Sequence, residues 1–367
     1  MNGTLESRLL TEREAMQRAL TLALRGWGRV SPNPLVGAVL LRDGAVVGEG
    51  YHGEFGGPHA EVAALASCED PRGCTCVVTL EPCSHVGKTR SCATALIEAE
   101  VSRVVAAVED PNPEAAHGAH RLRDAGIEVE FGLESQAAVA QNAAFFHAIL
   151  RPDRPFVCLK VATSLDGYLA DVNRKSQWIS GREAHEYVHW LRAGFDAIGV
   201  GRVTACEDDP ALTVRGALVP MIPPRRVIFS RTGRLPTDLA VVKTAREIPT
   251  YLIAASTATG RDALAGSGVV TVRADSLEES LRALRRKGVR SLLVEGGGEI
   301  ATAFLEQQLV DRLIWIQAPI WLHKGVSAFG SRSPVTLDMA ERWNVIDQRL
   351  LGSDTLLVLD RELCLQG

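Results

Sequence analysis

Apolar residues at the start of the chain follow a helical pattern and then a strand pattern. A capping box at Thr11 and Glu14 precedes apolar positions three and four residues apart, which predicts a helix. Two apolar runs, residues 35–41 and 45–47, flank the dipeptide Asp43-Gly44. This dipeptide is typical of a two-residue hairpin turn, so the two runs are predicted to pair as a β-hairpin.

The next stretch alternates helices with buried strands. A helix is predicted over residues 58–67, with Pro58 in its first turn, where proline is well tolerated. Apolar runs at residues 76–80 and 104–108 are typical of buried strands, and a helical pattern over residues 92–99 lies between them. This alternation predicts a three-layer α/β domain.

The second half of the chain repeats the alternation with different residues. The predicted strands cover residues 156–161, 197–200, 226–229, 251–254 and 291–294. The predicted helices cover residues 182–192, 277–287 and 299–307. A second α/β domain is therefore expected.

A charged segment with two prolines, residues 151–155, separates the halves. It follows a helical pattern that ends near Leu150 and precedes an apolar strand, which predicts a domain boundary between residues 1–150 and 151–367. Residues 1–150 contain 12 Lys and Arg against 19 Asp and Glu, which leaves 28 against 25 for the rest. The second domain is therefore the better candidate for binding phosphate groups.

The composition is that of a soluble globular protein. Of 367 residues, 46% are hydrophobic and 23% are charged, which excludes disordered, collagen-like and disulfide-rich chains. The net charge of -4 argues against a nucleic-acid partner, because nucleic-acid phosphates attract basic proteins. No apolar segment reaches the length of a membrane span or resembles a signal peptide. We expect a cytoplasmic protein with a small-molecule partner. The composition is compatible with a homo-oligomer as well as with a monomer.

The residues that could bind a metal or catalyse a reaction are concentrated in the first domain. Five of the eight cysteines lie between residues 68 and 92, and cysteines of a reducing compartment are more often metal ligands or core residues than disulfides. Two of them, Cys83 and Cys92, follow the motif His59-Ala60-Glu61. One imidazole and two thiolates with an open fourth position make a catalytic zinc site. We therefore predict that His59, Cys83 and Cys92 bind Zn²⁺.

Glu61 is the candidate general acid and base. In zinc deaminases the glutamate of an H-x-E motif is not a metal ligand and moves protons. Zinc lowers the pKa of a bound water from 15.7 to about 7, which corresponds to roughly 12 kcal/mol, whereas a positioned general base contributes roughly 3–5 kcal/mol. The predicted reaction is the hydrolytic removal of an exocyclic amine.

Other interpretations of the metal site stay open at this point. The zinc could be structural, with Cys74, Cys76 or His85 as a fourth ligand. The site could also stabilise a non-catalytic assembly module. Finally, a zinc deaminase could act on a free nucleoside or on a base in RNA.

The spacing of the two cysteines in the sequence restricts the choice of family. Cys92 lies nine positions after Cys83, whereas the common deaminase signature is P-C-x-x-C. With the H-A-E motif, residues 79–92 and the segment Pro-Asn-Pro-Leu-Val-Gly at residues 32–37, the chain resembles the bifunctional riboflavin-biosynthesis pyrimidine deaminase/reductase family. Members of that family usually read T-P-P-C where this chain has Thr89-Arg90-Ser91-Cys92.

The resemblance continues through the second half, in residues 160–167, 178–181, 191–193, 208–215 and 295–297. It implies a cytidine-deaminase-like three-layer α/β/α domain followed by a dihydrofolate-reductase-like α/β domain. It also implies two reactions, zinc-dependent deamination of 2,5-diamino-6-(5-phosphoribosylamino)pyrimidin-4-one and NADPH reduction of the ribosyl side chain to ribityl. The alternative is a zinc deaminase for a different nucleoside or nucleotide, with a divergent reductase-like domain.

The same resemblance implies roles for single residues. In the deaminase domain, the pyrimidine and its phosphate would be bound by Asn33, His52, His85 and Lys88. In the reductase domain, the substrate would be bound by Ser176, Arg192, Leu212, Arg215 and Glu295, with the two arginines on the phosphate. NADPH would be bordered by Ala162, Trp178, Thr204, Asp208 and Gly297. Two positions depart from the family pattern: His185, where arginine is common, and Ser230, where aspartate is common.

Overall fold

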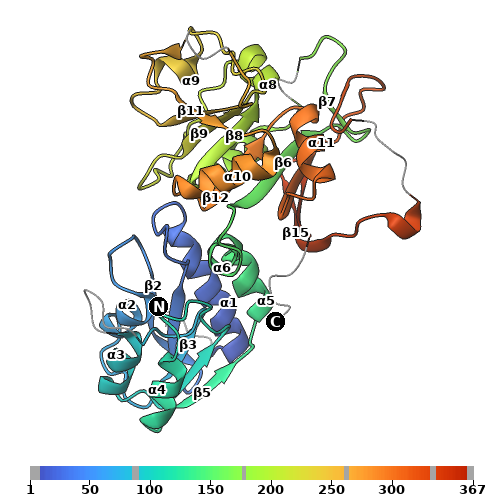
Figure 1. The fold of residues 1–367 in the computed structure, drawn as a ribbon. Coiled ribbons are helices and arrows are strands. Elements are labelled where there is room, and N and C mark those ends of the chain that lie inside the picture. Colours follow the sequence, from blue (N-terminus) through green and yellow to red (C-terminus); the bar gives the residue numbers. More distant parts are fainter. Residues whose placement is uncertain (1–8, 85–90, 176–178, 260–263, 331–335, 362–367) are drawn as a thin grey trace. The chain divides into compact units, whose positions relative to one another are not determined.

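The computed structural model describes residues 9–84, 91–175, 179–259, 264–330 and 336–361. The chain forms two compact units that join at Leu150 and Arg151 and are drawn in Figure 1. Within the described ranges, no helix is both long and apolar enough to cross a membrane. Six residues named in the sequence analysis lie outside these ranges: His85, Lys88, Thr89, Arg90, Ser176 and Trp178.

The N-terminal unit is built on a five-stranded sheet with the order β2-β1-β3-β4-β5. Strand β1 is antiparallel to both of its neighbours, whereas β3, β4 and β5 are parallel. The strands are β1 (Gly37–Arg42), β2 (Ala45–Tyr51), β3 (Thr75–Val78), β4 (Arg103–Ala106) and β5 (Glu128–Phe131). The helices are α1 (Glu12–Ala23), α2 (Ala60–Ala66), α3 (Cys92–Glu98), α4 (Gly118–Asp124), α5 (Ser135–Gln141) and α6 (Ala143–Leu150).

Helices cover both faces of this sheet. On one face α2, α3 and α4 pack through buried apolar residues that include Ala64, Leu96 and Leu122. On the other face α1 and α5 contribute Met16 and Ala138 to a second apolar cluster. The three-layer α/β arrangement predicted from the alternating pattern is confirmed.

The predicted hairpin forms, with one correction. Asp43 and Gly44 have φ angles of 54° and 80°, as a type I′ turn requires at both central positions. Strand β1 begins at Gly37, so the prediction of a strand from Leu35 was wrong. The backbone N–H and C=O of Leu35 instead form hydrogen bonds with the side chain of Asn142, at 2.8 and 2.9 Å.

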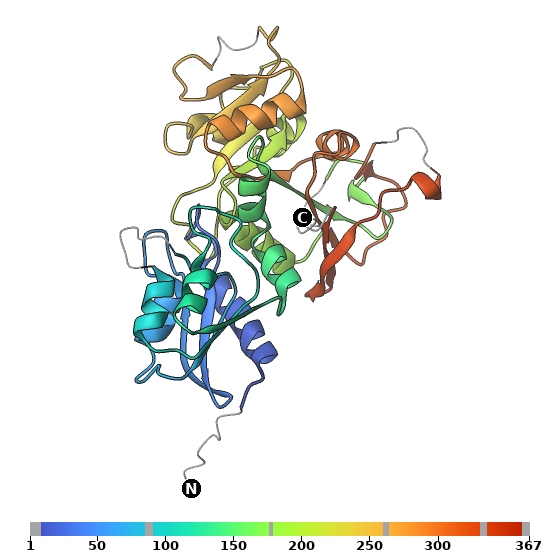
Figure 2. The ribbon, with the colours of Figure 1, turned by 60° about the horizontal axis from the view of Figure 1, so that its bottom comes forward.

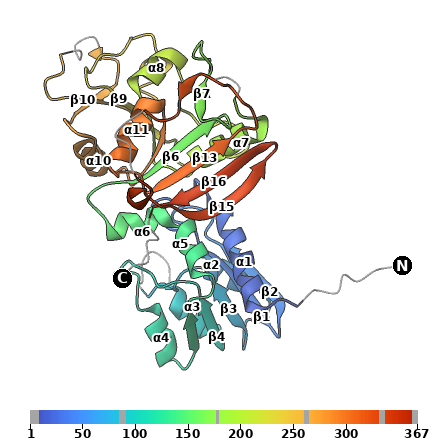
Figure 3. The same ribbon diagram turned by 90° about the vertical axis from the view of Figure 1, so that its right-hand side faces the viewer.

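The C-terminal unit contains a nine-stranded sheet with the order β11-β10-β9-β8-β12-β6-β13-β16-β15. The strands from β11 to β13 are parallel, and β16 and β15 add an antiparallel hairpin at one edge, as Figure 3 shows. The strands are β6 (Phe156–Thr163), β8 (Ala197–Gly201), β9 (Arg225–Phe229), β10 (Thr250–Ala254), β11 (Val270–Arg273), β12 (Ser291–Glu295), β13 (Arg312–Gln317), β15 (Asn344–Leu351) and β16 (Asp354–Asp360).

Helices also flank this second sheet. The helices are α7 (Arg182–Ala193), α8 (Arg202–Asp208), α9 (Ala240–Lys243), α10 (Leu277–Arg286) and α11 (Gly298–Glu306), and a short pair, β7 (Tyr168–Ala170) and β14 (Val326–Ser327), lies apart from the main sheet. Helix α10, orange in Figure 2, packs on the strands through Leu281 and Leu284. Parallel strands direct their carboxyl ends to one edge of the sheet, where α/β proteins bind ligands.

Candidate functional site

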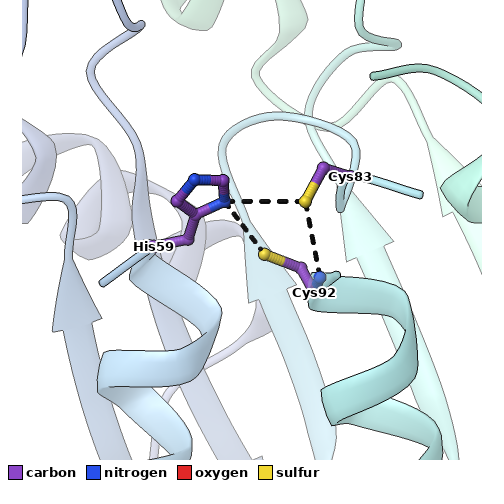
Figure 4. A group of neighbouring side chains, drawn as sticks. All are labelled: His59, Cys83 and Cys92. Atoms are coloured by element: carbon purple, nitrogen blue, oxygen red, sulfur yellow. Dashed lines mark hydrogen bonds between the residues drawn. The ribbon is translucent and has the colours of Figure 1, made fainter. Parts of the chain in front are cut away.

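Three metal-binding side chains come together in the N-terminal unit. His59 immediately precedes α2, Cys92 is the first residue of α3, and Cys83 lies in the segment between β3 and α3. Their ligand atoms all lie within 4.8 Å of one another, and Figure 4 shows the ring and the two sulfur atoms converging. The His59 Nδ1 atom is 3.2 Å from Cys92 Sγ and 3.6 Å from Cys83 Sγ. The structure thus joins the three residues singled out as zinc ligands.

The chemistry of this donor set fits zinc, which binds imidazole nitrogen and thiolate sulfur in tetrahedral sites. A hydrogen bond between the two thiols lowers the pKa of Cys83 and raises the pKa of Cys92, and metals bind both cysteines as thiolates. Within the described residues, no further His, Cys, Asp or Glu joins the group. Cys76, an alternative fourth ligand, packs in the core under α2 and α3. Among the described residues the group therefore has three protein ligands, the number found in catalytic zinc sites, which keep a fourth position for water. His85, another alternative fourth ligand, lies outside the described residues.

Glu61 lies in the first turn of α2, close to the cysteines. Its side chain is buried, with 3% of the residue exposed, and burial raises the pKa of its carboxyl group to about 7. The Glu61 carboxyl interacts with Cys92 but does not belong to the group of metal-binding atoms. A carboxyl group with a pKa near neutrality can both accept and donate a proton at neutral pH.

His52 and Asn33 form a hydrogen-bonded pair beside the metal-binding group. The His52 ring packs edge-on against the His59 ring, with the centroids 5.4 Å apart. Its Nδ1 atom lies 2.9 Å from the carbonyl oxygen of Pro58, and its Nε2 atom lies 3.1 Å from Asn33 Nδ2. A carbonyl oxygen only accepts, so Nδ1 carries the hydrogen and Nε2 accepts from the Asn33 amide. The Asn33 amide oxygen, which takes no part in this pair, can accept a hydrogen bond from a ligand N–H.

A buried ion cluster joins α7 to the neighbouring strands β6 and β12. Arg192 of α7 makes two hydrogen bonds to the Glu295 carboxylate, at 2.6 and 2.9 Å, and the side chains are only 16% and 10% exposed. Lys160 is the register partner of Glu295 on the neighbouring strand. Burial raises the pKa of Glu295, but the charges of Arg192 and Lys160 outweigh it, so the pKa is lowered overall. Burial lowers the pKa of Lys160.

The segment around Leu212 is tied to α7 by two hydrogen bonds. Arg192 donates to the carbonyl oxygen of Thr213 at 3.1 Å, and the backbone N–H of Arg215 donates to His189 Nδ1 at 3.1 Å. Leu212 is buried and has a φ of 49°, an unfavourable angle for a bulky residue that occurs mainly at functional sites. The Arg215 side chain is exposed. These hydrogen bonds thus link the segment of Arg215 to the helix of Arg192, the other predicted phosphate-binding arginine, which also pairs with Glu295.

A cavity of about 950 Å³ opens beside the carboxyl ends of β8, β9 and β10. Three of the residues expected to border NADPH line it: Thr204, Asp208 and Gly297. The backbone N–H of Gly297 donates to Thr204 Oγ1 at 3.1 Å, and a Cβ atom at Gly296 would lie 2.2 Å from the Ile300 side chain. Only glycine therefore fits this strand-to-helix turn, where backbone N–H groups can approach phosphates. Ala162 lies on β6 and is not among the described residues that line the cavity.

Size and chemistry make this cavity suitable for a dinucleotide. Its volume is at the upper end of the range for small-molecule sites, roughly 300–1,000 Å³. It lies where the strand order changes direction, between β8 and β12, as nucleotide sites do in parallel sheets. Ser230 and Arg231, directly after β9, also line it.

Sequence reasoning missed two candidate functional residues, Lys160 and Arg231. A lysine in the middle of the apolar run 156–161 was a signal for Lys160, because buried lysines are rare unless they are paired. Arg231 follows a predicted strand, and an arginine near the end of a strand in a nucleotide-binding sheet can bind the 2′-phosphate of NADP.

Two family descriptions match the chain. Residues 10–108 match the cytidine and deoxycytidylate deaminase zinc-binding region. Residues 155–356 match the RibD C-terminal domain. The matches cover the metal-binding group in one unit and both the ion cluster and the cavity in the other.

Characterised relatives match both halves together. The chain is 39% identical to the riboflavin biosynthesis protein RibD of Aquifex aeolicus, over 86% of this chain and 89% of the relative. It is 39% identical to Escherichia coli RibD, over 83% of this chain and 86% of the relative. Two solved structures each match 95% of this chain and 98% of their own chain. Acinetobacter baumannii RibD has a TM-score of 0.80 and is 35% identical. A Thermotoga maritima diaminohydroxyphosphoribosylaminopyrimidine deaminase/5-amino-6-(5-phosphoribosylamino)uracil reductase has a TM-score of 0.82 and is 34% identical.

Proposed function

The chain belongs to the RibD family of bifunctional deaminase/reductase enzymes of riboflavin biosynthesis, and on that premise we propose which of its residues carry each reaction. The first reaction is deamination of 2,5-diamino-6-(5-phosphoribosylamino)pyrimidin-4-one, and the second is NADPH reduction of the ribosyl group. The single observation that carries the assignment is the convergence of His59, Cys83 and Cys92 beside the buried Glu61. Thiol ligands and a nicotinamide cofactor suit a cytoplasmic location, where thiols stay reduced.

For the deaminase, we assign the zinc to His59, Cys83 and Cys92 and the proton transfers to Glu61. Bound zinc would activate a water molecule by lowering its pKa to about 7. Glu61 would accept one proton from that water and pass it to the pyrimidine ring nitrogen. It would then carry a second proton, from the hydroxyl group that the attack places on the ring carbon, to the departing amine. The position of Glu61 supports this role, because its side chain is buried in the first turn of α2 and interacts with Cys92. Asn33 accepts a hydrogen bond from the pyrimidine through its amide oxygen.

For the reductase, we assign NADPH to the cavity lined by Thr204, Asp208 and Gly297, and the ribosyl group to Glu295 and Lys160. NADPH supplies the hydride, so the protein's own tasks are to orient the sugar and to donate the proton. The reduction opens the ribose ring, and its oxygen must receive a proton as the hydride adds. Lys160 is the candidate donor, because burial lowers the pKa of its ammonium group and so makes the proton easier to release. Arg215 and the remaining donors of Arg192 bind the substrate phosphate, which suits the guanidinium fork.

Glu295→Gln should destabilise the protein and abolish reduction. The neutral amide leaves Arg192 and Lys160 buried without their counter-charge, which costs about 3–5 kcal/mol for a broken buried pair. Glu186→Gln is the control, since Glu186 pairs with Arg182 on the surface of α7 and should barely change stability. Denaturant unfolding followed by tryptophan fluorescence measures the difference. Equal stability of the two variants would contradict a buried charge cluster.

The same cluster predicts how stability depends on pH. The pKa of Glu295 is lowered in the folded state, so its contribution is present above the pKa of a free glutamate and is lost as the pH falls through the folded pKa. The Glu295→Gln variant should therefore lose less stability on acidification than the parent protein.

Arg231→Gln should weaken NADPH binding and leave NADH binding unchanged. The two cofactors differ only in the 2′-phosphate, and a charge-assisted hydrogen bond to that group is worth about 10- to 100-fold in KM. Arg234→Gln is the matched control, because Arg234 is exposed nearby and does not line the cavity among the described residues. Steady-state KM values for both cofactors provide the test. A parallel rise for NADH and NADPH would contradict this role of Arg231.

A further inference from the structure

The loop that carries Asn33 is held by a residue far away in the sequence. Asn142 lies between α5 and α6 with only 5% of its surface exposed. Its side-chain oxygen accepts a hydrogen bond from the Leu35 backbone N–H at 2.8 Å, and its amide nitrogen donates to the Leu35 carbonyl oxygen at 2.9 Å. Both polar groups of the Leu35 backbone are thereby satisfied by one side chain, as a neighbouring strand would do.

This clamp acts two residues from Asn33. The Leu35 side chain is itself buried against Ala23 and Val30, so backbone and side chain are both fixed. The other support is His52, whose backbone N–H donates to the Val36 carbonyl oxygen at 2.9 Å and whose ring accepts from the Asn33 amide. Asn33 is therefore fixed through its backbone on one side and through its side chain on the other.

We propose that Asn142 is a positioning residue of the deaminase, which sets the place of Asn33 by holding the Leu35 backbone. The proposal rests on the proposed role of Asn33 in binding the pyrimidine. Displacing a binding group by a fraction of an ångström weakens a hydrogen bond that depends on distance and angle. Asn142 thus acts on substrate binding through Asn33 and does not touch the reacting atoms.

The position of Asn142 extends the deaminase site beyond its recognised region. The zinc-binding region matched by family comparison ends at residue 108, and Asn142 lies 34 residues further on, at the C-cap of α5. Helix α6 begins at the next residue and ends at Leu150, the last residue before the second unit. The junction of α5 and α6 is therefore bonded to the loop that carries Asn33.

Steady-state deaminase kinetics of Asn142→Ala, Asn33→Ala and the double variant test this in the full-length enzyme. Asn142→Ala should raise the KM for the diaminopyrimidinone ribosyl phosphate about tenfold, the fold-change of one hydrogen bond, with a smaller change in kcat. In the Asn33→Ala background the same change should have no further effect on KM, because two residues that act through one contact are not additive. Asn142→Asp has the same size and keeps the acceptor for the Leu35 N–H, so it covers the case in which the alanine variant fails to fold.

Two controls separate positioning from general damage. Gln141→Ala removes the amide of the preceding residue, the last of α5, which donates to the carbonyl oxygen of Leu20 in α1 and not to Leu35; it should leave the deaminase KM unchanged. Zinc content and NADPH oxidation with deaminated substrate should stay at parent levels in every variant. Additive KM effects in the double variant, or an unchanged KM in Asn142→Ala and Asn142→Asp, would overturn the proposal. An unchanged KM in Asn33→Ala would instead overturn the role of Asn33.

Discussion

Glu61→Gln is expected to abolish ammonia release while the protein keeps its zinc and its reductase activity. The amide has the size of the carboxyl group but cannot accept the proton from water or return it to the leaving amine. Loss of a positioned general acid and base lowers kcat by about 10²–10⁴-fold. Glu61 lies outside the metal-binding group, so metal content should not change. Ammonia assay, zinc analysis and NADPH oxidation with deaminated substrate give the three readings.

A matched control for this variant is Glu49→Gln. Glu49 lies on β2 of the same unit and pairs with Arg18 on the surface. The Glu49→Gln variant therefore makes the same change from carboxyl to amide away from the site. Its ammonia release should equal that of the parent enzyme. If Glu61→Gln kept most of its activity, another group would be the proton carrier. If it lost zinc, Glu61 would be a ligand.

Cys92→Ala should remove both the zinc and the deaminase activity. An imidazole and one sulfur are too few ligands to retain the ion against dilution, and without zinc no water is activated at neutral pH. Metal content should fall from about one ion per chain to near zero, whereas NADPH oxidation with deaminated substrate should continue. Chelation of the parent enzyme should reproduce both results.

Cys76→Ala is the control for this loss. Cys76 is fully buried on β3 and was an alternative fourth ligand, but it packs among apolar side chains of the core. The variant should keep its zinc and its ammonia release. Zinc loss as complete as in Cys92→Ala would indicate four protein ligands and a closed, structural site.

The features that could be predicted from the sequence depend on local chemistry. The Asp43-Gly44 turn needs positive φ angles that few other pairs adopt, so its hairpin was evident. His59 and Cys92 lie at the starts of helices that the spacing of apolar residues predicted. One imidazole and two thiol side chains in these motifs indicated zinc. The resemblance supplied Thr204 and Gly297, which the structure joins by a hydrogen bond.

The features that were missed depend on partners far apart in the sequence. Strand β1 starts late because Asn142 occupies the Leu35 backbone from 107 positions away. Arg192 was predicted to bind the substrate phosphate, yet it pairs with Glu295, 103 positions away, in the interior. Strand β15 has mostly exposed or half-buried residues and lacks the apolar alternation that would have marked it as the edge of the sheet. Such pairings depend on the tertiary packing of segments far apart in the sequence, which no local pattern encodes.

The most direct test is the mass of the product formed from 2,5-diamino-6-(5-phosphoribosylamino)pyrimidin-4-one, with and without NADPH. Without NADPH, we expect a single product in which one amine has been exchanged for oxygen, with ammonia released in equal amount. With NADPH, that product should gain two further hydrogens on its sugar. An unchanged substrate in both reactions, or a reduced product that keeps its amine, would contradict an enzyme with a zinc deaminase in one unit and a reductase in the other.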